Sequence, residues 1–502
     1  MITASSPGTI TASPPAEATE RGFRVGRTPL PYVALERGAD DAIVIERGGF
    51  GGRPAYVRCE RDVVLASTDL AWVVERSRAL GLGLTLDPDR LAADCLLDPG
   101  AAGRTQTTFR EIAEVPPATR AHVALGRMTL TRLPAPAPAP REVAERGGTD
   151  LVDRLRALLF AAIERAVEGA PCVGVLTGGG LDSSALLSMT LALGVRANAF
   201  AIDFGGPGDD RPHLVTLARS LRIDPVRVAP SDAPLPAALT AAGMPLTWPS
   251  GAAEARLLRS ALDWGASRAL SGLGADQWFD GDPGAATLAQ AMRRSLRRQL
   301  PWTVRRFLLR RLRPRVPVWL GPRAKQILLE THERHLDERP WVERTPVERI
   351  EAGFVDPHLA HASALRLQLE RLSGILRVDP YLDADLATFA LALPPHELLG
   401  ASGPSARRGL FREALRGVLP ESLRMRADKA SFVPVHRALF RAPLLASLAP
   451  HAGATRLADL GIVEPRAFRR AFDATVASAA PAPIDARIYA TLAVEACLDG
   501  TR

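Results

Sequence analysis

Short alternating runs of apolar residues dominate the first part of the chain. Ala42-Ile-Val-Ile45, Ala55-Tyr-Val-Arg58 and Val63-Val-Leu-Ala66 lie between clusters of Gly, Asp and Arg. Short runs of this kind, bounded by turn residues, predict β-strands. Two stretches with helical spacing follow, near residues 70–80 and 88–96. The pattern therefore predicts a mainly antiparallel sheet accompanied by two helices.

The pattern changes in the second part of the chain. Apolar residues recur at helical spacing over 151–167, and the short apolar run Cys172-Val-Gly-Val-Leu176 follows as a buried strand. Strands alternating with helices predict a parallel sheet covered on both faces, and from about residue 284 the pattern is largely helical. The further predicted segments are a helix at 184–193, a strand at 197–204, a helix at 213–221 and strands at 225–228 and 268–271.

A stiff Pro/Ala segment separates the two patterns. Leu133-Pro-Ala-Pro-Ala-Pro-Ala-Pro140 has the composition of an extended interdomain linker. A length of 502 residues also favours two domains over one. The first residues are rich in Ser, Thr, Ala and Pro and lack the pattern of a secretory signal, which favours disorder. The predicted parts are a disordered leader at 1–22, a first domain at 23–132, a linker at 133–148 and a second domain at 149–502.

Composition narrows the class of protein. Hydrophobic residues make up 47% and charged residues 24%, which is typical of a globular protein, and no apolar run is long enough to span a membrane. The cysteines are scattered without paired spacing, which argues against disulfides and structural zinc and favours the cytoplasm. These four cysteines are Cys59, Cys95, Cys172 and Cys497.

The net charge of +8 comes from one basic segment. Arginines are dense between Arg293 and Lys325, and no acidic residue lies between Asp282 and Glu330. The segment is compatible with a solvated helical face, or with a wall that binds an acidic peptide or pyrophosphate. Nucleic acid is disfavoured as a partner because stackable aromatic residues are few. Lys325 and Lys429 are the only lysines in the chain.

A glycine-rich loop follows the predicted strand 172–176 and opens a helix. Its sequence is Leu176-Thr-Gly-Gly-Gly-Leu-Asp-Ser-Ser184. Such a loop lies at the carboxyl edge of a parallel sheet, where backbone N–H groups and the helix amino terminus can bind phosphate. Glycines alone are equally compatible with an ordinary tight turn. Asp182 beside a phosphate site indicates an intervening Mg²⁺, for which it would be a ligand.

The loop resembles the SGGxDS signature of the N-type ATP pyrophosphatases, in the LSGGLDSS form of asparagine synthetases. Gly178 replaces the first serine of that signature, and neither GxxxxGK[ST] nor GxGxxG is present in the loop. The resemblance implies an ATP pyrophosphatase fold that binds ATP and Mg²⁺. The residues that it assigns to the nucleotide in this loop are Leu176, Gly178, Gly179, Gly180, Asp182, Ser183 and Ser184.

A second motif follows the predicted strand 268–271. Ser271-Gly-Leu-Gly-Ala-Asp-Gln-Trp-Phe-Asp-Gly281 resembles the family element G-x-G-x-D-E-x-F-x-G, with Gln277 in place of Glu. The resemblance makes Asp276 the second metal ligand and places Ser271 and Gly272 along the nucleotide. It also places Ile202, in the predicted strand at 197–204, against adenine.

A third motif lies near the carboxyl terminus. A basic helix over 407–416, then Leu419-Pro420, then Arg424-Met-Arg-Ala-Asp-Lys-Ala-Ser-Phe432 is similar to the family's carboxy-terminal pattern. The resemblance makes Lys429 the catalytic lysine, which would neutralise charge developing on the adenylate phosphate and on the carbonyl oxygen. The scarcity of lysine in this chain supports that role over a solvated surface lysine.

The first domain resembles a class II, Ntn-type glutaminase domain. Phe50-Gly-Gly-Arg-Pro-Ala-Tyr56, Leu65-Ala-Ser-Thr68 and Leu86-Asp-Pro-Asp-Arg-Leu91 follow that domain's order. Its chemistry needs a cysteine directly after the initiator methionine, and Ile2 occupies that position. We therefore expect a degenerate domain with a structural role and no glutaminase activity.

The residues near the expected acyl site narrow the kind of ligase. Leu273 and Leu376 stand where β-lactam and asparagine synthetases carry a Tyr or Glu, so no base dyad is expected. Three features resemble lasso-peptide macrolactam synthetases: Leu273, the continuation Gln277-Trp-Phe279 after Asp276, and the arginine-rich segment ending in Pro317-Val-Trp-Leu320. Those enzymes adenylate an Asp or Glu side chain of a precursor peptide and close a ring with its α-amino group. The implied partners are that precursor and the pathway's leader-binding protein or protease. Two alternatives remain: a small-molecule asparagine- or β-lactam-type ligase, and an inactive scaffold protein.

Overall fold

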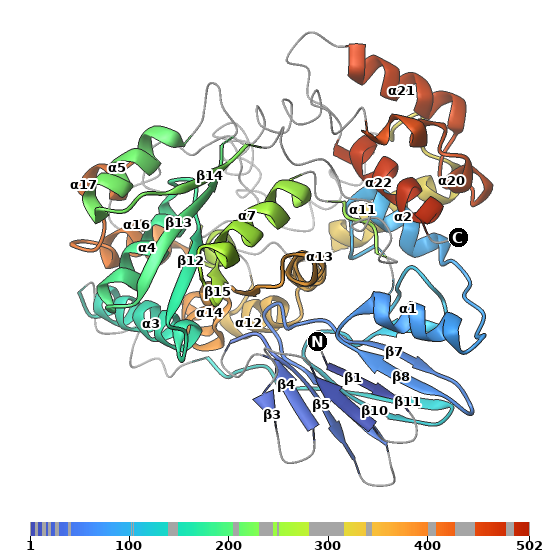
Figure 1. Cartoon of the computed structure of the whole chain (residues 1–502), viewed down its shortest axis with the longest axis horizontal. Helices are drawn as coiled ribbons and strands as arrows, with labels where there is room; N and C mark the ends of the chain where they lie inside the picture. Colours follow the sequence, from blue (N-terminus) through green and yellow to red (C-terminus); the bar gives the residue numbers. More distant parts are fainter. Residues whose placement is uncertain are drawn as a thin grey trace.

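The computed structural model shows a molecule with a β-rich part and a larger α/β and helical part (Figure 1). Lys429, the linker beyond residue 138 and most of the basic segment lie outside the residues that the structure describes. The described ranges are 2–5, 9–12, 17–18, 22–25, 30–38, 42–101, 103, 105–138, 149–203, 210–229, 244–247, 250–280, 316–337, 344–399, 408–426, 447–477 and 486–500.

Two antiparallel sheets form the β-rich part, at the bottom of Figure 1. Their strand orders are β2-β1-β8-β7-β9 and β11-β10-β6-β5-β4-β3. Leu35 and Ile45 from one sheet and Val57 from the other belong to one buried apolar cluster, so the sheets stack face to face. The strands are β1 Ile2–Ser5, β2 Thr9–Ala12, β3 Glu17–Ala18, β4 Gly22–Val25, β5 Val33–Arg37, β6 Ile43–Arg47, β7 Tyr56–Cys59, β8 Val64–Ser67, β9 Ile112–Glu114, β10 Thr119–Ala124 and β11 Arg127–Arg132.

The amino terminus differs from the sequence prediction. Residues 1–22 are predicted to be a disordered leader, whereas strands β1 to β4 occupy much of the segment from Ile2 to Val25. Strand β1 pairs antiparallel with β8, with Thr3 opposite Ser67. The composition suggests disorder, but the alternating Ile and Thr residues have high β-propensity, and an existing sheet edge satisfies their backbone groups.

The two helices predicted in the first domain are confirmed. Helix α1 spans Leu70–Ala79 and α2 spans Pro88–Leu96. Asp69 and Asp87 cap their amino termini by accepting hydrogen bonds from backbone N–H groups in the first turns. Sequence patterning and local capping therefore determine both elements.

A five-stranded parallel sheet forms the core of the second part. Its order is β14-β13-β12-β15-β16. Ala199 packs into the cluster that contains α4, and the next residue, Phe200, packs into the cluster that contains α7, so helices cover both faces. The short strand β16 is absent from the sequence prediction. The strands are β12 Cys172–Leu176, β13 Arg196–Ile202, β14 Val226–Val228, β15 Arg268–Leu270 and β16 Leu376–Val378.

Helices surround this sheet and extend into a carboxy-terminal layer, drawn in orange and red in Figure 1. The longer helices are α3 Thr149–Val167, α4 Leu181–Ala192, α5 Arg211–Leu221, α7 Gly251–Asp263, α11 Pro322–Asp337, α12 Pro346–Phe354, α13 Pro357–Ser373, α14 Ala384–Ala392, α21 Pro465–Ala477 and α22 Ala486–Gly500. The short ones are α8 Ala275–Phe279, η5 Pro380–Leu382, α15 Pro395–Leu399, α16 Gly409–Ala414, α17 Glu421–Arg424, η6 Ala449–Gly453 and α20 Thr455–Asp459.

The two parts of the molecule share apolar clusters. Leu91 of α2 lies in the same buried cluster as Leu492 of α22. Tyr56 of β7 lies in the same cluster as Leu258 of α7 and Leu369 of α13. Burying apolar surface of both parts in common cores couples their stabilities. Among the described residues, no helix has the length and apolar character needed to cross a membrane.

Candidate functional site

The glycine loop lies at the carboxyl edge of the parallel sheet. It follows Leu176, the last residue of β12, and leads into α4, as the sequence predicts. The Thr177 hydroxyl lies 2.8 Å from the Ser183 hydroxyl and accepts a hydrogen bond from the Gly179 N–H at 3.2 Å. Thr177 therefore holds the loop closed from within, which the sequence motif alone does not reveal.

Two of the loop glycines have different surroundings. Gly179 has φ of +99°, and a Cβ there would lie 2.6 Å from the backbone nitrogen of Leu214 in α5. A side chain at this position would both strain the backbone and clash with α5. Gly178 is the opposite case, because a Cβ there would meet no atom within 4 Å. The missing serine hydroxyl thus leaves open space beside the loop.

The amino terminus of α4 is arranged to receive an anion. Gly180 is its N-cap and provides no side chain that could accept from the N–H groups of the first turn. Those groups and the helix dipole favour phosphate. Ser183 lies in this first turn, and Ser184 is buried with its hydroxyl unpartnered among the described residues. The geometry fits the predicted role of the loop in binding a nucleotide.

The two predicted metal ligands meet at one guanidinium. Arg408 contacts the carboxylate of Asp182 in the first turn of α4 and that of Asp276 in α8. It also contacts Asp280, and its own side chain is buried. A Cβ on Gly272 would lie 3.4 Å from the Cβ of Asp182, so the loops after β12 and β15 pack closely.

This convergence fits a Mg²⁺ site. Mg²⁺ in nucleotide sites is commonly held by one or two carboxylates, with phosphates and water completing its coordination. Asp182 and Asp276 supply such a pair beside the anion-binding loop. No cluster of three or more His, Cys, Asp or Glu side chains suited to a metal occurs within the described ranges.

A second arginine fixes the glycine loop from the same carboxy-terminal segment. Arg426 donates to the Gly179 carbonyl at 2.9 Å and to the carboxylate of Asp210 at 2.8 Å. Burial is the main cause that lowers the pKa of the Arg412 guanidinium, and the nearby cation of Arg408 lowers this pKa further. Lys429 itself is outside the described residues. The sequence locates this basic segment but does not identify Arg408 and Arg426 as its contacts with the loop.

The Ser271 hydroxyl belongs to a buried polar network. It donates to Asp379 and accepts a hydrogen bond from Arg377 at 2.8 Å. The Ser271 N–H also donates to the Val378 carbonyl at 3.1 Å, which extends the pairing of β15 with β16. The structure thus gives this hydroxyl protein partners, while Gly272 lies beside Asp182. Ile202 ends β13 at the same edge of the sheet.

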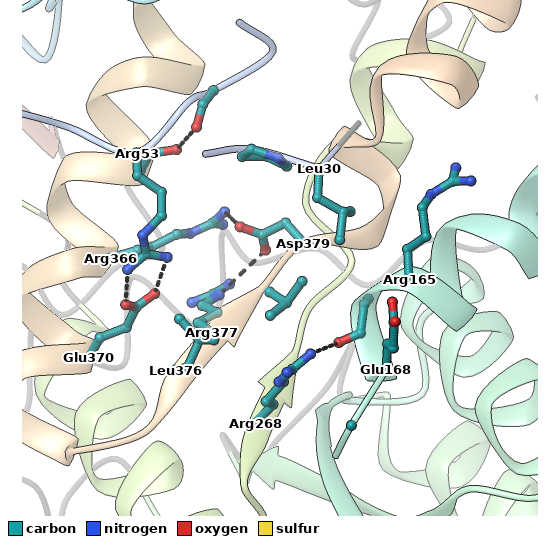
Figure 2. Close-up of a pocket in the computed structure, with 16 residues that line it drawn as sticks. Leu30, Arg53, Arg165, Glu168, Arg268, Arg366, Glu370, Leu376, Arg377 and Asp379 are labelled. Carbon is teal, nitrogen blue, oxygen red and sulfur yellow. Dashed lines mark hydrogen bonds and ion pairs between the residues drawn. The ribbon is translucent and has the colours of Figure 1, made fainter. Parts of the chain in front are cut away.

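The network continues into a charged cavity of about 330 Å³ between the two parts of the molecule (Figure 2). Arg366 donates to Asp379 at 3.3 Å, and Arg53 pairs with Glu370. Burial raises the pKa of the Glu370 carboxyl and lowers the pKa of the Arg377 guanidinium. The cavity is therefore lined by ion pairs, of which Arg53–Glu370 ties the amino-terminal part to α13 and Arg366–Asp379 ties α13 to the residue that follows β16.

The two leucines at the expected base positions pack into different clusters. Leu273 is partly buried against the main core around the parallel sheet, and Leu376 packs against the core of the β-rich part. Neither side chain can take up a proton. The structure therefore shows no acid–base pair formed by these two positions.

A comparison with models of protein families identifies the family to which the chain belongs. The model described as asparagine synthase matches residues 154–485, more than half of the chain. The chain belongs to the asparagine synthase family, and this supports an ATP-dependent carbon–nitrogen ligase activity of the amidotransferase type. No curated protein matches the chain significantly.

Proposed function

We propose that the protein is an ATP-dependent macrolactam synthetase. It adenylates the side-chain carboxylate of an Asp or Glu in a precursor peptide, with release of pyrophosphate. The peptide's α-amino group then attacks the acyl adenylate, so that an amide bond forms and AMP leaves. This reaction is a special case of the ligase chemistry that family membership supports.

The observation that carries the proposal is Leu273 at the end of the loop after β15. This position lies two residues beyond Ser271, at the edge of the sheet where the predicted nucleotide residues gather. A leucine offers no base to a nucleophile of high pKa. An α-amino group has an unperturbed pKa of about 7.7 to 8.0, so part of it is already neutral near pH 7. Such an amine needs positioning more than deprotonation.

The surroundings of the four cysteine thiols support a nucleophilic amine that does not come from glutamine hydrolysis. Cys95 and Cys497 are buried in an apolar cluster, and burial raises the pKa of the Cys95 thiol. Cys172 is buried and donates to the Gly265 carbonyl at 2.8 Å. Burial also raises the pKa of the Cys59 thiol, which donates to the Ala124 carbonyl at 2.9 Å. The raised pKa of the Cys59 and Cys95 thiols opposes formation of the reactive thiolate that glutaminase chemistry needs.

The remaining site residues have defined tasks in the proposal. The glycine loop and the first turn of α4 bind the phosphates through backbone N–H groups. Asp182 and Asp276 would hold Mg²⁺, which would supply charge neutralisation on the phosphates. Lys429 stabilises negative charge on the adenylate phosphate and on the carbonyl oxygen.

The proposal is tested by incubating the protein with Mg²⁺-ATP and a cleaved candidate precursor peptide. The expected product is the peptide minus one water, together with AMP. Release of AMP only with small amino acids would favour a small-molecule ligase. Absence of adenylation with every carboxylate, with no further change in Asp182→Asn, would favour an inactive scaffold.

A further inference from the structure

A second, mostly apolar cavity of about 400 Å³ lies where the amino-terminal part meets the synthetase part. We call it the junction cavity. Its walls come from the end of α2, one face of α13, the start of α7 and the first residue of α22. The residues that matter below are Asp94, Leu97, Glu254, His361, Ala362 and Arg366.

The junction cavity opens at the same edge of the sheet as the glycine loop. Helix α7 ends at Asp263, shortly before β15 begins at Arg268. Because α7 returns the chain to the start of a parallel strand, its own first turns lie at the carboxyl edge, where ligands bind in such sheets. Glu254, in the first turn, contacts Arg377, which in turn donates to Ser271 at 2.8 Å. The contacts of Arg377 with Glu254 and Ser271 thus link the cavity wall to the loop after β15, where Ser271 and Gly272 are predicted to lie along the nucleotide.

Three charged groups in the cavity wall have ion-pair partners, whereas Asp98, which also lines the cavity, has one buried carboxylate oxygen without a hydrogen-bond partner among the described residues. Asp94 pairs with Arg90 at 3.1 Å, and Arg366 pairs with Asp379 at 3.3 Å. Glu254 pairs with Arg377 as described. The other walls are mainly alanine, leucine and proline side chains. A cavity with mainly apolar walls suits an apolar side chain, and the free oxygen of Asp98 can accept a hydrogen bond from a peptide N–H beside it.

His361 adds one directed hydrogen-bond donor. Its Nδ1 lies 3.1 Å from Nη2 of Arg90. Arginine can only donate, so Nδ1 must accept, and the neutral ring carries its proton on Nε2. Burial and the Arg90 cation lower the pKa of His361 to about 3, which keeps the ring neutral at ordinary pH. This Nε2–H suits a peptide carbonyl.

Leu97 lines the cavity and has a backbone conformation and an exposure that are both unfavourable for a leucine. It ends α2 in the left-handed conformation, with φ of 57° and ψ of 34°, where glycine is the usual residue. Its side chain is also 38% exposed. Backbone strain and exposed apolar surface both oppose a leucine here, and folding alone gives no reason for it. Non-glycine residues with a strained backbone conformation are found preferentially at binding and active sites.

We propose that the junction cavity binds an apolar side chain of the peptide substrate, with Leu97 as a wall and His361 donating to a backbone carbonyl. This inference rests on the proposed function, for which it defines the substrate class further. It also gives the amino-terminal part a role, since α2 supplies a wall of the substrate site.

The test uses Leu97→Gly, which removes the side chain and relieves the strain. Arg222→Gly is the matched control, because Arg222 ends α5 in the same left-handed conformation, with φ of 55°. The probes are N-acetylated tripeptide amides with Leu, Phe or Ser in the middle, and binding is followed by saturation-transfer NMR. Thermal unfolding of both variants is measured in parallel.

We expect the Leu and Phe tripeptides to bind better than the Ser tripeptide. Leu97→Gly should weaken their binding about fivefold without lowering the unfolding temperature, and Arg222→Gly, which relieves the same strain, should leave the binding unchanged and likewise not lower that temperature. Ala362→Phe, which fills the cavity, should also reduce binding. Equal binding by wild type and Leu97→Gly, or no preference over the Ser tripeptide, would overturn the inference.

Kinetics with a cleaved precursor separate this inference from the proposed function. Preferential binding of the Leu and Phe tripeptides without any precursor-dependent AMP release refutes the macrolactam synthetase but retains a peptide site. AMP release whose KM for the precursor is the same in wild type and Leu97→Gly refutes the cavity inference and leaves the macrolactam synthetase standing. An unchanged KM for ATP in Leu97→Gly is expected in either case.

Discussion

The guanidinium of Arg408 contacts the carboxylate of Asp182, 226 residues earlier in the chain. The same guanidinium contacts Asp276 and Asp280, so one buried cation neutralises carboxylates from two different loops. This arrangement makes the stability of the site depend on a residue from the carboxy-terminal segment.

Replacing this cation should destabilise the protein. In Arg408→Met, three carboxylates lose their common partner, and we expect the free energy of unfolding to fall by about 3 kcal/mol. Mg²⁺ should recover part of the loss in the variant, because a divalent cation bound by Asp182 and Asp276 neutralises charge that Arg408 no longer neutralises. Urea unfolding with and without Mg²⁺ measures both effects. Arg416→Met, which removes only an exposed pair with Glu413, is the control.

The two loop glycines should respond in opposite ways to serine. Gly178→Ser places a hydroxyl in open space beside the loop, so we expect intact folding and about fivefold tighter ATP binding. Gly179→Ser forces a side chain into α5 at positive φ and should reduce both stability and ATP affinity. Calorimetric titration with ATP and thermal unfolding test the pair. Similar behaviour of the two variants would contradict the described loop geometry.

The two lysines of the chain provide a matched comparison. Lys429→Arg keeps the charge but changes its shape, and we expect AMP formation to slow about 100-fold if the compact ammonium stabilises the transition state. Lys325→Arg in α11 should leave the rate unchanged within about twofold. Steady-state AMP release measures both variants. Equal rates of AMP release by Lys429→Arg and Lys325→Arg would show that Lys429 has no catalytic role.

His361 should make stability depend on pH. Burial and Arg90 lower its pKa in the folded protein to about 3, whereas an unfolded histidine has a pKa of about 6.5. Between these values the unfolded chain binds more protons, so this contribution to stability is complete above about pH 6.5 and declines as the pH falls. Urea unfolding at pH 7.5 and 5 should show a smaller decrease in His361→Gln than in wild type. An equal decrease would show that the ring does not titrate on unfolding.

Local patterns predict much of this fold and site. The strand, glycine loop and helix from Cys172 to Ala192 are evident because each element has its own periodicity and turn residues. Asp182 and Asp276 are identified separately by motifs, and the structure shows that they meet. Arg408 is not singled out, because nothing in a basic helical pattern indicates which arginine reaches a loop so distant in sequence. Strand β1 is missed because the Ser-, Thr-, Ala- and Pro-rich composition around it suggests disorder, while its pairing with β8 is not visible in the sequence.

The apolar clusters shared by α2, α7, α13 and α22 limit which fragments of the protein can fold without the β-rich part. A fragment starting at Thr149 would lose the partners of Leu258 and Leu492 and would present those surfaces to water. Such a fragment should be recovered as aggregates rather than as an independent enzyme. Mutations in the β-rich part can therefore abolish ligation through insolubility, without altering any atom that touches a reactant.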